Sequence, residues 1–108
     1  MDAARALSAL GHETRLSIFR LLVQAGPAGA AAGDIARALD LAPNALSFHL
    51  KDLAFAGLVS SRSAGRFVIY SANFESMNVL IAFLTENCCG GEVCAPAPAK
   101  TRSPRRKS

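Results

Sequence analysis

Leucines at helical spacing mark residues 41–59 as the stretch around which the chain is organised. Three or four positions separate successive members of an apolar stripe, which predicts a helix with one buried face; the stripe is Leu46, Leu50, Leu53 and Ala54. Pro43 suits the first turn, where its missing N–H is not needed. Gly57 suits the position just past the helix end, where left-handed backbone is favoured. We therefore expect a helix over residues 43–57.

The opposite face of this helix is small, polar and singly basic. Its members are Asn44, Ser47, Phe48, Lys51 and Phe55. A short helix with a buried back and such a front has the shape that enters the DNA major groove. An ordinary amphipathic surface helix is the alternative, and the flanking segments decide between the two.

Both flanks favour DNA binding. Residues 33–40 predict a short helix and a tight connection, the first half of a helix-turn-helix. Residues 58–71 contain two β-rich runs around Ser63-Ala64-Gly65, which predicts a hairpin with Arg62 and Arg66 beside its turn. Two helices followed by such a hairpin form a winged helix-turn-helix.

Three further helices are expected, over residues 2–9, 13–25 and 74–87. Gly11 should end the first helix, and the glycines and proline in residues 26–30 should end the second. Asn73 should cap the start of the last helix. The expected apolar faces comprise Ala4, Leu7 and Leu10; Leu16, Ile18, Phe19, Leu22 and Val23; and Phe74, Met77, Leu80, Ile81, Phe83 and Leu84. Arg15 and Arg20 should be solvated or salt-bridged. The last helix is too apolar for a monomer surface, so we expect a second subunit to cover it.

Several motifs in this order resemble the ArsR/SmtB family of bacterial repressors over roughly residues 2–87. They are Leu10-Gly11-His12-Glu13-Thr14-Arg15-Leu16 continuing to Leu22, Ser47-Phe48-His49-Leu50-Lys51-Asp52-Leu53, Ala56-Gly57-Leu58-Val59, and Gly65-Arg66-Phe67-Val68-Ile69-Tyr70. The resemblance implies a mainly α fold with a small β-hairpin (α+β), in which the first and last helices pack across a homodimer. It also implies that the partner is operator DNA with an inverted repeat.

The same resemblance assigns the DNA contacts. Asn44, Ser47 and His49 would approach bases or phosphates, Lys51 would contact the backbone, and Arg62 and Arg66 of the wing would straddle phosphates or the minor groove. Asn can pair with adenine, and Ser reaches a base or a phosphate. Many relatives carry Arg where this chain has Phe48, which either touches a thymine methyl or packs on its neighbours. His49 lies at the edge of the apolar stripe, so it either anchors the helix or reads a base.

Charge and composition narrow the class of protein. The 108 residues carry a formal charge of +4, but five of the twelve basic residues lie in the last nine positions. DNA affinity is therefore argued from the placement of Lys51, Arg62 and Arg66. The chain lacks a membrane-length apolar run and a secretory signal pattern, so we expect a cytoplasmic protein with reduced cysteines. A nucleotide-binding glycine motif and clustered carboxylates are also missing, which argues against an enzyme.

All three cysteines, Cys88, Cys89 and Cys94, fall within seven residues that follow the last helix. In regular helix the adjacent pair would point about 100° apart, but Gly90-Gly91 allows the helix end to unwind and Cys94 to return. Three thiolates suit a soft ion such as As(III), Sb(III) or an organoarsenical, and the resemblance agrees, because a subset of arsenic-responsive members has such a site here. The Cys-x-Cys pair of many metal-sensing members has no counterpart at residues 30–33.

The resulting organisation has a winged helix-turn-helix and dimerisation domain at 1–87, an inducer-binding segment at 88–94 and a disordered basic tail at 95–108. We expect a repressor of an arsenic-resistance operon that As(III) releases from its operator. Alternatives for the cysteines are a zinc or cadmium sensor, a disulfide-forming redox switch and thiols without function. A thiol-rich metal-sequestering protein is the rival from another class.

Overall fold

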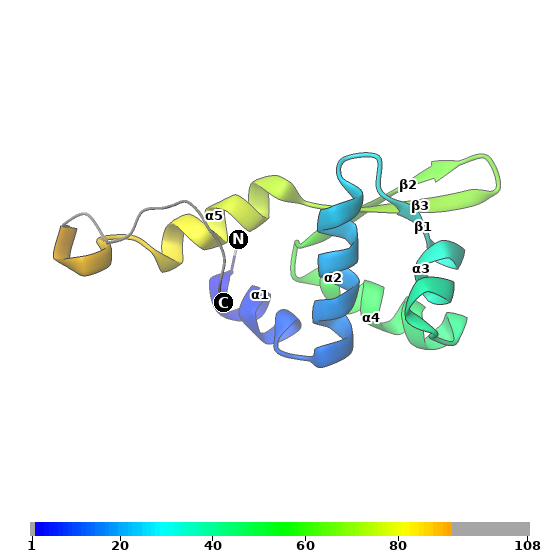
Figure 1. The fold of residues 1–108 in the computed structure, drawn as a ribbon, viewed down its shortest axis with the longest axis horizontal. Helices are drawn as coiled ribbons and strands as arrows, with labels where there is room; N and C mark the ends of the chain where they lie inside the picture. Colours follow the sequence, from blue (N-terminus) through cyan, green and yellow to red (C-terminus); the bar gives the residue numbers. More distant parts are fainter. Residues whose placement is uncertain (1, 92–108) are drawn as a thin grey trace.

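The computed structural model describes residues 2–91, so Cys94 and the basic tail at 95–108 lie outside the described residues. Its elements in chain order are α1 (Ala3–Leu10), α2 (Glu13–Ala25), β1 (Ala30–Ala31), α3 (Ala32–Leu39), α4 (Pro43–Phe55), β2 (Val59–Ala64), β3 (Phe67–Ala72), α5 (Phe74–Leu84) and a short 3₁₀ segment, Cys88–Gly91. The expected mainly α fold with a winged helix-turn-helix is confirmed. Figure 1 shows the sheet and its hairpin at one end and α5 at the other.

Polar side chains at the helix starts explain where three of the helices begin. Asp2 accepts the backbone N–H of Arg5 (3.1 Å), and Asn73 accepts that of Ser76 (3.0 Å). His12 caps α2, where its Nδ1 accepts the N–H of Thr14 at 3.1 Å. Such bonds satisfy N–H groups that have no partner inside the helix.

The core forms where α2, α3 and α4 meet the base of the sheet. Its fully buried large side chains are Ile18, Leu22, Ile35, Leu46, Leu50, Leu53 and Leu58. The prediction of the buried faces is wrong for two residues of α4 and α2: Ala54 is exposed, and Leu16 is 42% exposed. In α1 the side that packs on the core carries Ala6 and Ala9, while Leu7 points outward and is 43% exposed.

The helix-turn-helix consists of α3 and α4, joined by a tight connection. Asp40 adopts the left-handed conformation (φ 55°), and the N–H of Leu41 returns to the carbonyl of Ala36 at 2.9 Å. Pro43 occupies the first turn of α4 as expected. Gly57 has φ 80°, and the N–H of the next residue, Leu58, bonds the Leu53 carbonyl at 3.0 Å, as in a helix that ends on a left-handed residue.

The sheet has three antiparallel strands in the order β1-β3-β2. The expected hairpin is present, but its turn lies later than the predicted Ser63-Ala64-Gly65. Strand pairing continues to Ala64 and Phe67, so Gly65 and Arg66 form the turn. Strand β1 was not predicted at all. It pairs Ala30 with Tyr70 and Ala31 with Ile69.

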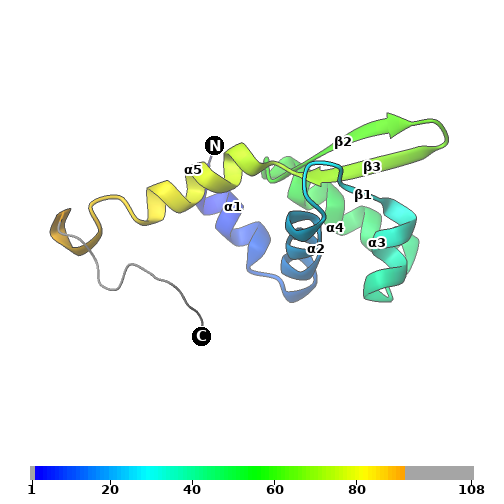
Figure 2. The same cartoon turned by 45° about the horizontal axis from the view of Figure 1, so that its top comes forward.

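The last helix ends at Leu84, three residues earlier than predicted. The Thr85 hydroxyl donates to the carbonyl of Ile81 at 2.8 Å, and Asn87 takes the left-handed conformation (φ 55°). Figure 2 shows α5 running over α1 and away from the helix-turn-helix. In α5 only Leu80 belongs to the buried core, at 5% exposure, whereas Val79, Ile81, Phe83 and Leu84 are each half or more exposed.

Candidate nucleic-acid interface and cysteine segment

The outward side of α4 presents the residues predicted to contact DNA. Asn44, Ser47, Phe48 and Lys51 are all exposed, and Phe48 keeps 66% of its surface accessible. The leucines on the other side hold the helix on the core, so this front is presented by a rigid element. An exposed amide, hydroxyl, aromatic ring and ammonium on one short helix offer hydrogen bonding, apolar contact and one positive charge to a groove.

His49 lies apart from this front, at the contact between α4 and the start of α2. Its ring is half-buried, with the ring centroid 4.9 Å from that of His12. Its Nδ1 is buried without a hydrogen-bond partner among the described residues. Burial lowers the pKa of His49, and electrostatic interactions with His12 and Arg15 lower it further, against a smaller opposite effect of Asp52. This position fits a helix-anchoring histidine, while its contact with DNA stays a prediction.

The two wing arginines have different surroundings. Arg66 lies in the hairpin turn, where it and the neighbouring Phe67 are exposed, the latter by 63%. Arg62 lies on β2, and its Nη2 donates to the backbone carbonyl of Ala28 at 3.1 Å. The strand register therefore places Arg66 in the turn at the tip of the projecting hairpin (Figure 1) and Arg62 two residues before the last paired residue of β2, Ala64. Sequence reasoning missed Phe67 as a member of the exposed tip.

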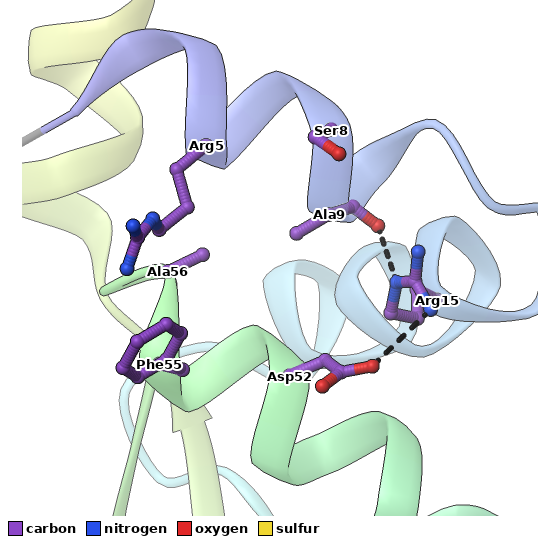
Figure 3. Close-up of a pocket in the computed structure, with 7 residues that line it drawn as sticks. All are labelled: Arg5, Ser8, Ala9, Arg15, Asp52, Phe55 and Ala56. Atoms are coloured by element: carbon purple, nitrogen blue, oxygen red, sulfur yellow. Dashed lines mark hydrogen bonds and ion pairs between the residues drawn. The ribbon is translucent and has the colours of Figure 1, made fainter.

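Arg15 connects α4 to α1, as Figure 3 shows. Its Nε donates to the Ala9 carbonyl at 2.7 Å, and its Nη1 lies 3.4 Å from Oδ2 of Asp52 on α4. Of the two arrangements expected for Arg15, salt-bridged or solvated, the structure shows the salt bridge. A cavity of about 370 Å³ opens beside this contact, and on its other side Arg5 lies 4.5 Å above the ring of Phe55.

The adjacent cysteines lie in a segment that has left the α-helix. Cys89 is left-handed (φ 58°, ψ 33°), as is Gly90 after it, and the sulfurs of Cys88 and Cys89 are 3.6 Å apart. The expected unwinding at the helix end therefore brings together two sulfur atoms that regular helix would separate. Cys88 is free and exposed, whereas Cys89 is disulfide-bonded.

Residues 2–91 contain no group of three His, Cys, Asp or Glu side chains arranged to hold a metal ion. The third predicted ligand, Cys94, lies outside these residues, so the full three-cysteine site stays a prediction. Within the same part of the chain, no helix has both the length and the apolar character needed to cross a bilayer.

Comparisons with known proteins agree with this geometry. A family model described as a helix-turn-helix domain matches residues 10–62. The HTH-type transcriptional regulator YgaV of Escherichia coli (strain K12) is 34% identical over 88 residues, which cover 82% of this chain and 87% of YgaV. An ArsR-like transcriptional regulator from Rhodococcus sp. RHA1 superposes with a TM-score of 0.67 at 33% identity and covers 76% of this chain and 74% of its own. The chain belongs to the ArsR family of transcriptional regulators.

Two further solved structures are informative about subunit assembly and about the effector. A homodimeric winged helix-turn-helix DNA-binding domain from Mycobacterium bovis, studied by solution NMR, is 27% identical with a TM-score of 0.63 and covers 82% of both chains. A protein described as a possible transcriptional regulator for arsenical resistance is 28% identical with a TM-score of 0.64, and covers 73% of this chain and 79% of its own. As an ArsR-family member, this protein is a DNA-binding transcriptional regulator, and the relatives have a regulatory rather than a catalytic role.

Proposed function

We propose that this ArsR-family protein is a homodimeric, cytoplasmic repressor of an arsenic-resistance operon, released from an inverted-repeat operator when As(III) binds Cys88, Cys89 and Cys94. The single observation that carries the effector assignment is the 3.6 Å approach of the Cys88 and Cys89 sulfurs at the end of α5. Family membership supplies the DNA-binding role, and the arsenic-specific step goes beyond it.

Dimerisation is supported by the apolar surface that α1 and α5 leave open. Leu7 on α1 and Val79, Ile81, Phe83 and Leu84 on α5 are between 43% and 58% exposed. Exposed apolar patches of this kind in small soluble proteins mark association surfaces. The Mycobacterium bovis relative is a homodimer of the same domain.

Operator binding would combine two readouts in each subunit. Asn44, Ser47 and Phe48 on the front of α4 would face base edges in the major groove, and Lys51 would contact a phosphate. Arg66 at the wing tip would reach the backbone or the minor groove. A dimer doubles these contacts and places them one helical turn apart, which corresponds to the two halves of an inverted repeat.

The choice of As(III) follows from the donor set. Closely spaced thiols are soft ligands. The two histidines of the chain are engaged elsewhere, with His12 capping α2 and His49 packed against it. The similarity to a protein described as a possible regulator for arsenical resistance points the same way. Because Cys89 is disulfide-bonded in the structure, the proposed site requires the reduced protein.

Release would follow from the position of this site. The cysteines begin four residues after the end of α5, the helix whose exposed side we assign to the dimer contact. Ligation that rearranges residues 85–91 would alter how the two α5 helices meet, and with it the separation of the recognition helices. A coupling free energy of about 1–3 kcal/mol, typical for such linkage, would lower operator affinity by roughly 5- to 150-fold.

Fluorescence anisotropy of a labelled duplex from the protein's own promoter tests this proposal. The reduced protein should bind the duplex and be released by micromolar arsenite, whereas the Cys88→Ser/Cys89→Ser/Cys94→Ser variant should bind equally well and not be released. Peroxide, zinc and cadmium are run in parallel. Release of the serine variant by arsenite, or release of the wild type only by the other agents, would overturn the assignment of arsenic as the effector. The role as a DNA-binding regulator would still stand. A protein that binds arsenite but no promoter DNA at low salt would instead support the sequestering role.

A further inference from the structure

Arg62 lies midway along the wing, and its side chain reaches the loop that precedes β1. It lies on β2 opposite Ile69 of β3, and its guanidinium donates to the carbonyl of Ala28 in the loop between α2 and β1. Strand β1, which follows this loop, pairs Ala31 with the same Ile69. The loop is therefore joined to the wing twice, through a backbone strand pair on β3 and through a side chain from β2.

Gly29 provides an independent sign that this junction is tightly built. Its φ is 74°, and a Cβ at this position would lie 2.3 Å from the carbonyl oxygen of Tyr70, closer than atoms can approach. The backbone of the loop thus packs directly against the backbone of β3. By contrast, Gly26 has a similar φ of 79° but open space where its Cβ would be.

This junction connects the wing to the helix-turn-helix, because β1 ends at Ala31 and α3 begins at the next residue. Whatever holds the loop against the hairpin also fixes the direction of the hairpin relative to α3 and α4. Figure 2 shows the hairpin extending past this junction as a projecting arm. A small rotation at this junction would move the tip, and Arg66 with it, by a larger distance.

We propose that Arg62 is a positioning residue that clamps the wing to the α2–β1 loop and thereby aims Arg66 at DNA, instead of neutralising a phosphate itself. The inference rests on the wing contacting DNA, which is part of the proposed function, and it is independent of the inducer. Arg62, which the sequence predicted to contact DNA, thereby takes an intramolecular role. The effect of Arg62 on operator binding then passes through Arg66.

A double-mutant cycle on operator affinity tests this dependence, with Arg62→Met, Arg66→Met and the double variant measured over a series of salt concentrations without arsenite. Arg66→Met should weaken binding and reduce the slope of log K against log salt by about 0.9 for each phosphate that the protein no longer neutralises. Arg62→Met should weaken binding roughly three- to tenfold, the range for one net hydrogen bond. The double variant should bind like Arg66→Met alone. Effects that multiply in the double variant, or an Arg62→Met variant that binds like wild type, would overturn the clamp while leaving the repressor proposal standing.

Gly29→Ala disturbs the same junction without changing any charge, and Gly26→Ala is its matched control. Hydroxyl-radical footprinting should show that Gly29→Ala and Arg62→Met lose protection where the wing meets DNA but retain it in the major groove, and that Gly26→Ala retains both. A role in stability alone would lower the melting temperature and leave the footprint unchanged, which would refute the clamp. If Gly29→Ala does not fold, the double-mutant cycle with Arg62→Met and Arg66→Met still tests the proposal.

Discussion

Replacing Ile81 and Leu84 with serine should dissociate the proposed dimer without unfolding the subunit. These residues are three positions apart on α5 and share a side of the helix. They are 51% and 56% exposed, so roughly half of each side chain remains to be covered by a partner. Neither belongs to the buried core, which contacts α5 mainly through Leu80.

The magnitude follows from the uncovered area. Fully burying an Ile or Leu side chain contributes about 1.5–3 kcal/mol, so covering the remaining half contributes about 1 kcal/mol. Two residues in each of two subunits then account for about 4 kcal/mol of dimerisation free energy. With a tenfold change for every 1.4 kcal/mol, the dimer Kd should rise roughly a thousandfold.

Analytical ultracentrifugation over a dilution series measures this Kd, with circular dichroism to verify that the helices remain. Leu16→Ser is the matched control, because Leu16 is 42% exposed but lies on α2, outside the α1–α5 surface. It should leave the Kd unchanged. A Kd that stays within a few-fold of wild type in the double variant, or that rises equally in Leu16→Ser, would refute the assignment of the dimer contact to α5.

Three further outcomes are expected. Leu53→Ala removes a side chain with no exposed surface and should lower the free energy of unfolding by about 2–5 kcal/mol in urea denaturation; a decrease below about 1 kcal/mol would contradict its place in the core. Gly57→Ala, at φ 80° with open space around it, should cost about 1–2 kcal/mol through backbone strain alone, measured as a lower Tm at unchanged helix content. Because the folded pKa of His49 lies below its usual 6.5, its contribution to stability is complete above pH 6.5 and is lost as the pH falls through the folded value. His49→Gln should therefore flatten the decline of unfolding free energy below pH 6.5, and an unchanged slope would count against this account.

The helices were predictable because their signals are local. Pro43, the leucine stripe and Gly57 define α4 within fifteen residues of one another, and the structure places its ends at Pro43 and Phe55. The exposed front of α4 follows from the same periodicity. For α5 the start was marked by Asn73, but no glycine or proline marks the end, which depends on the Thr85 hydroxyl and a left-handed Asn87.

Features that depend on distant partners could not be predicted in this way. Strand β1 has only two alanines and forms because Tyr70 and Ile69 lie beside it in the fold. The partner of Arg62 is a backbone carbonyl 34 positions away, which carries no side-chain signal. The contact between His12 and His49 likewise exists only once α2 and α4 have packed, although the position of His49 at the edge of the stripe indicated partial burial.

Arg15 gives the subunit a mechanical property that none of its helices has alone. One guanidinium contacts the last turn of α1 through the Ala9 carbonyl and the last turn of α4 through Asp52. A displacement of α1 at a subunit contact would therefore be passed to α4 through this one side chain. Under the proposed mechanism, regulation would then require no change within α4 itself, only a change in the angle at which the two subunits of a dimer meet.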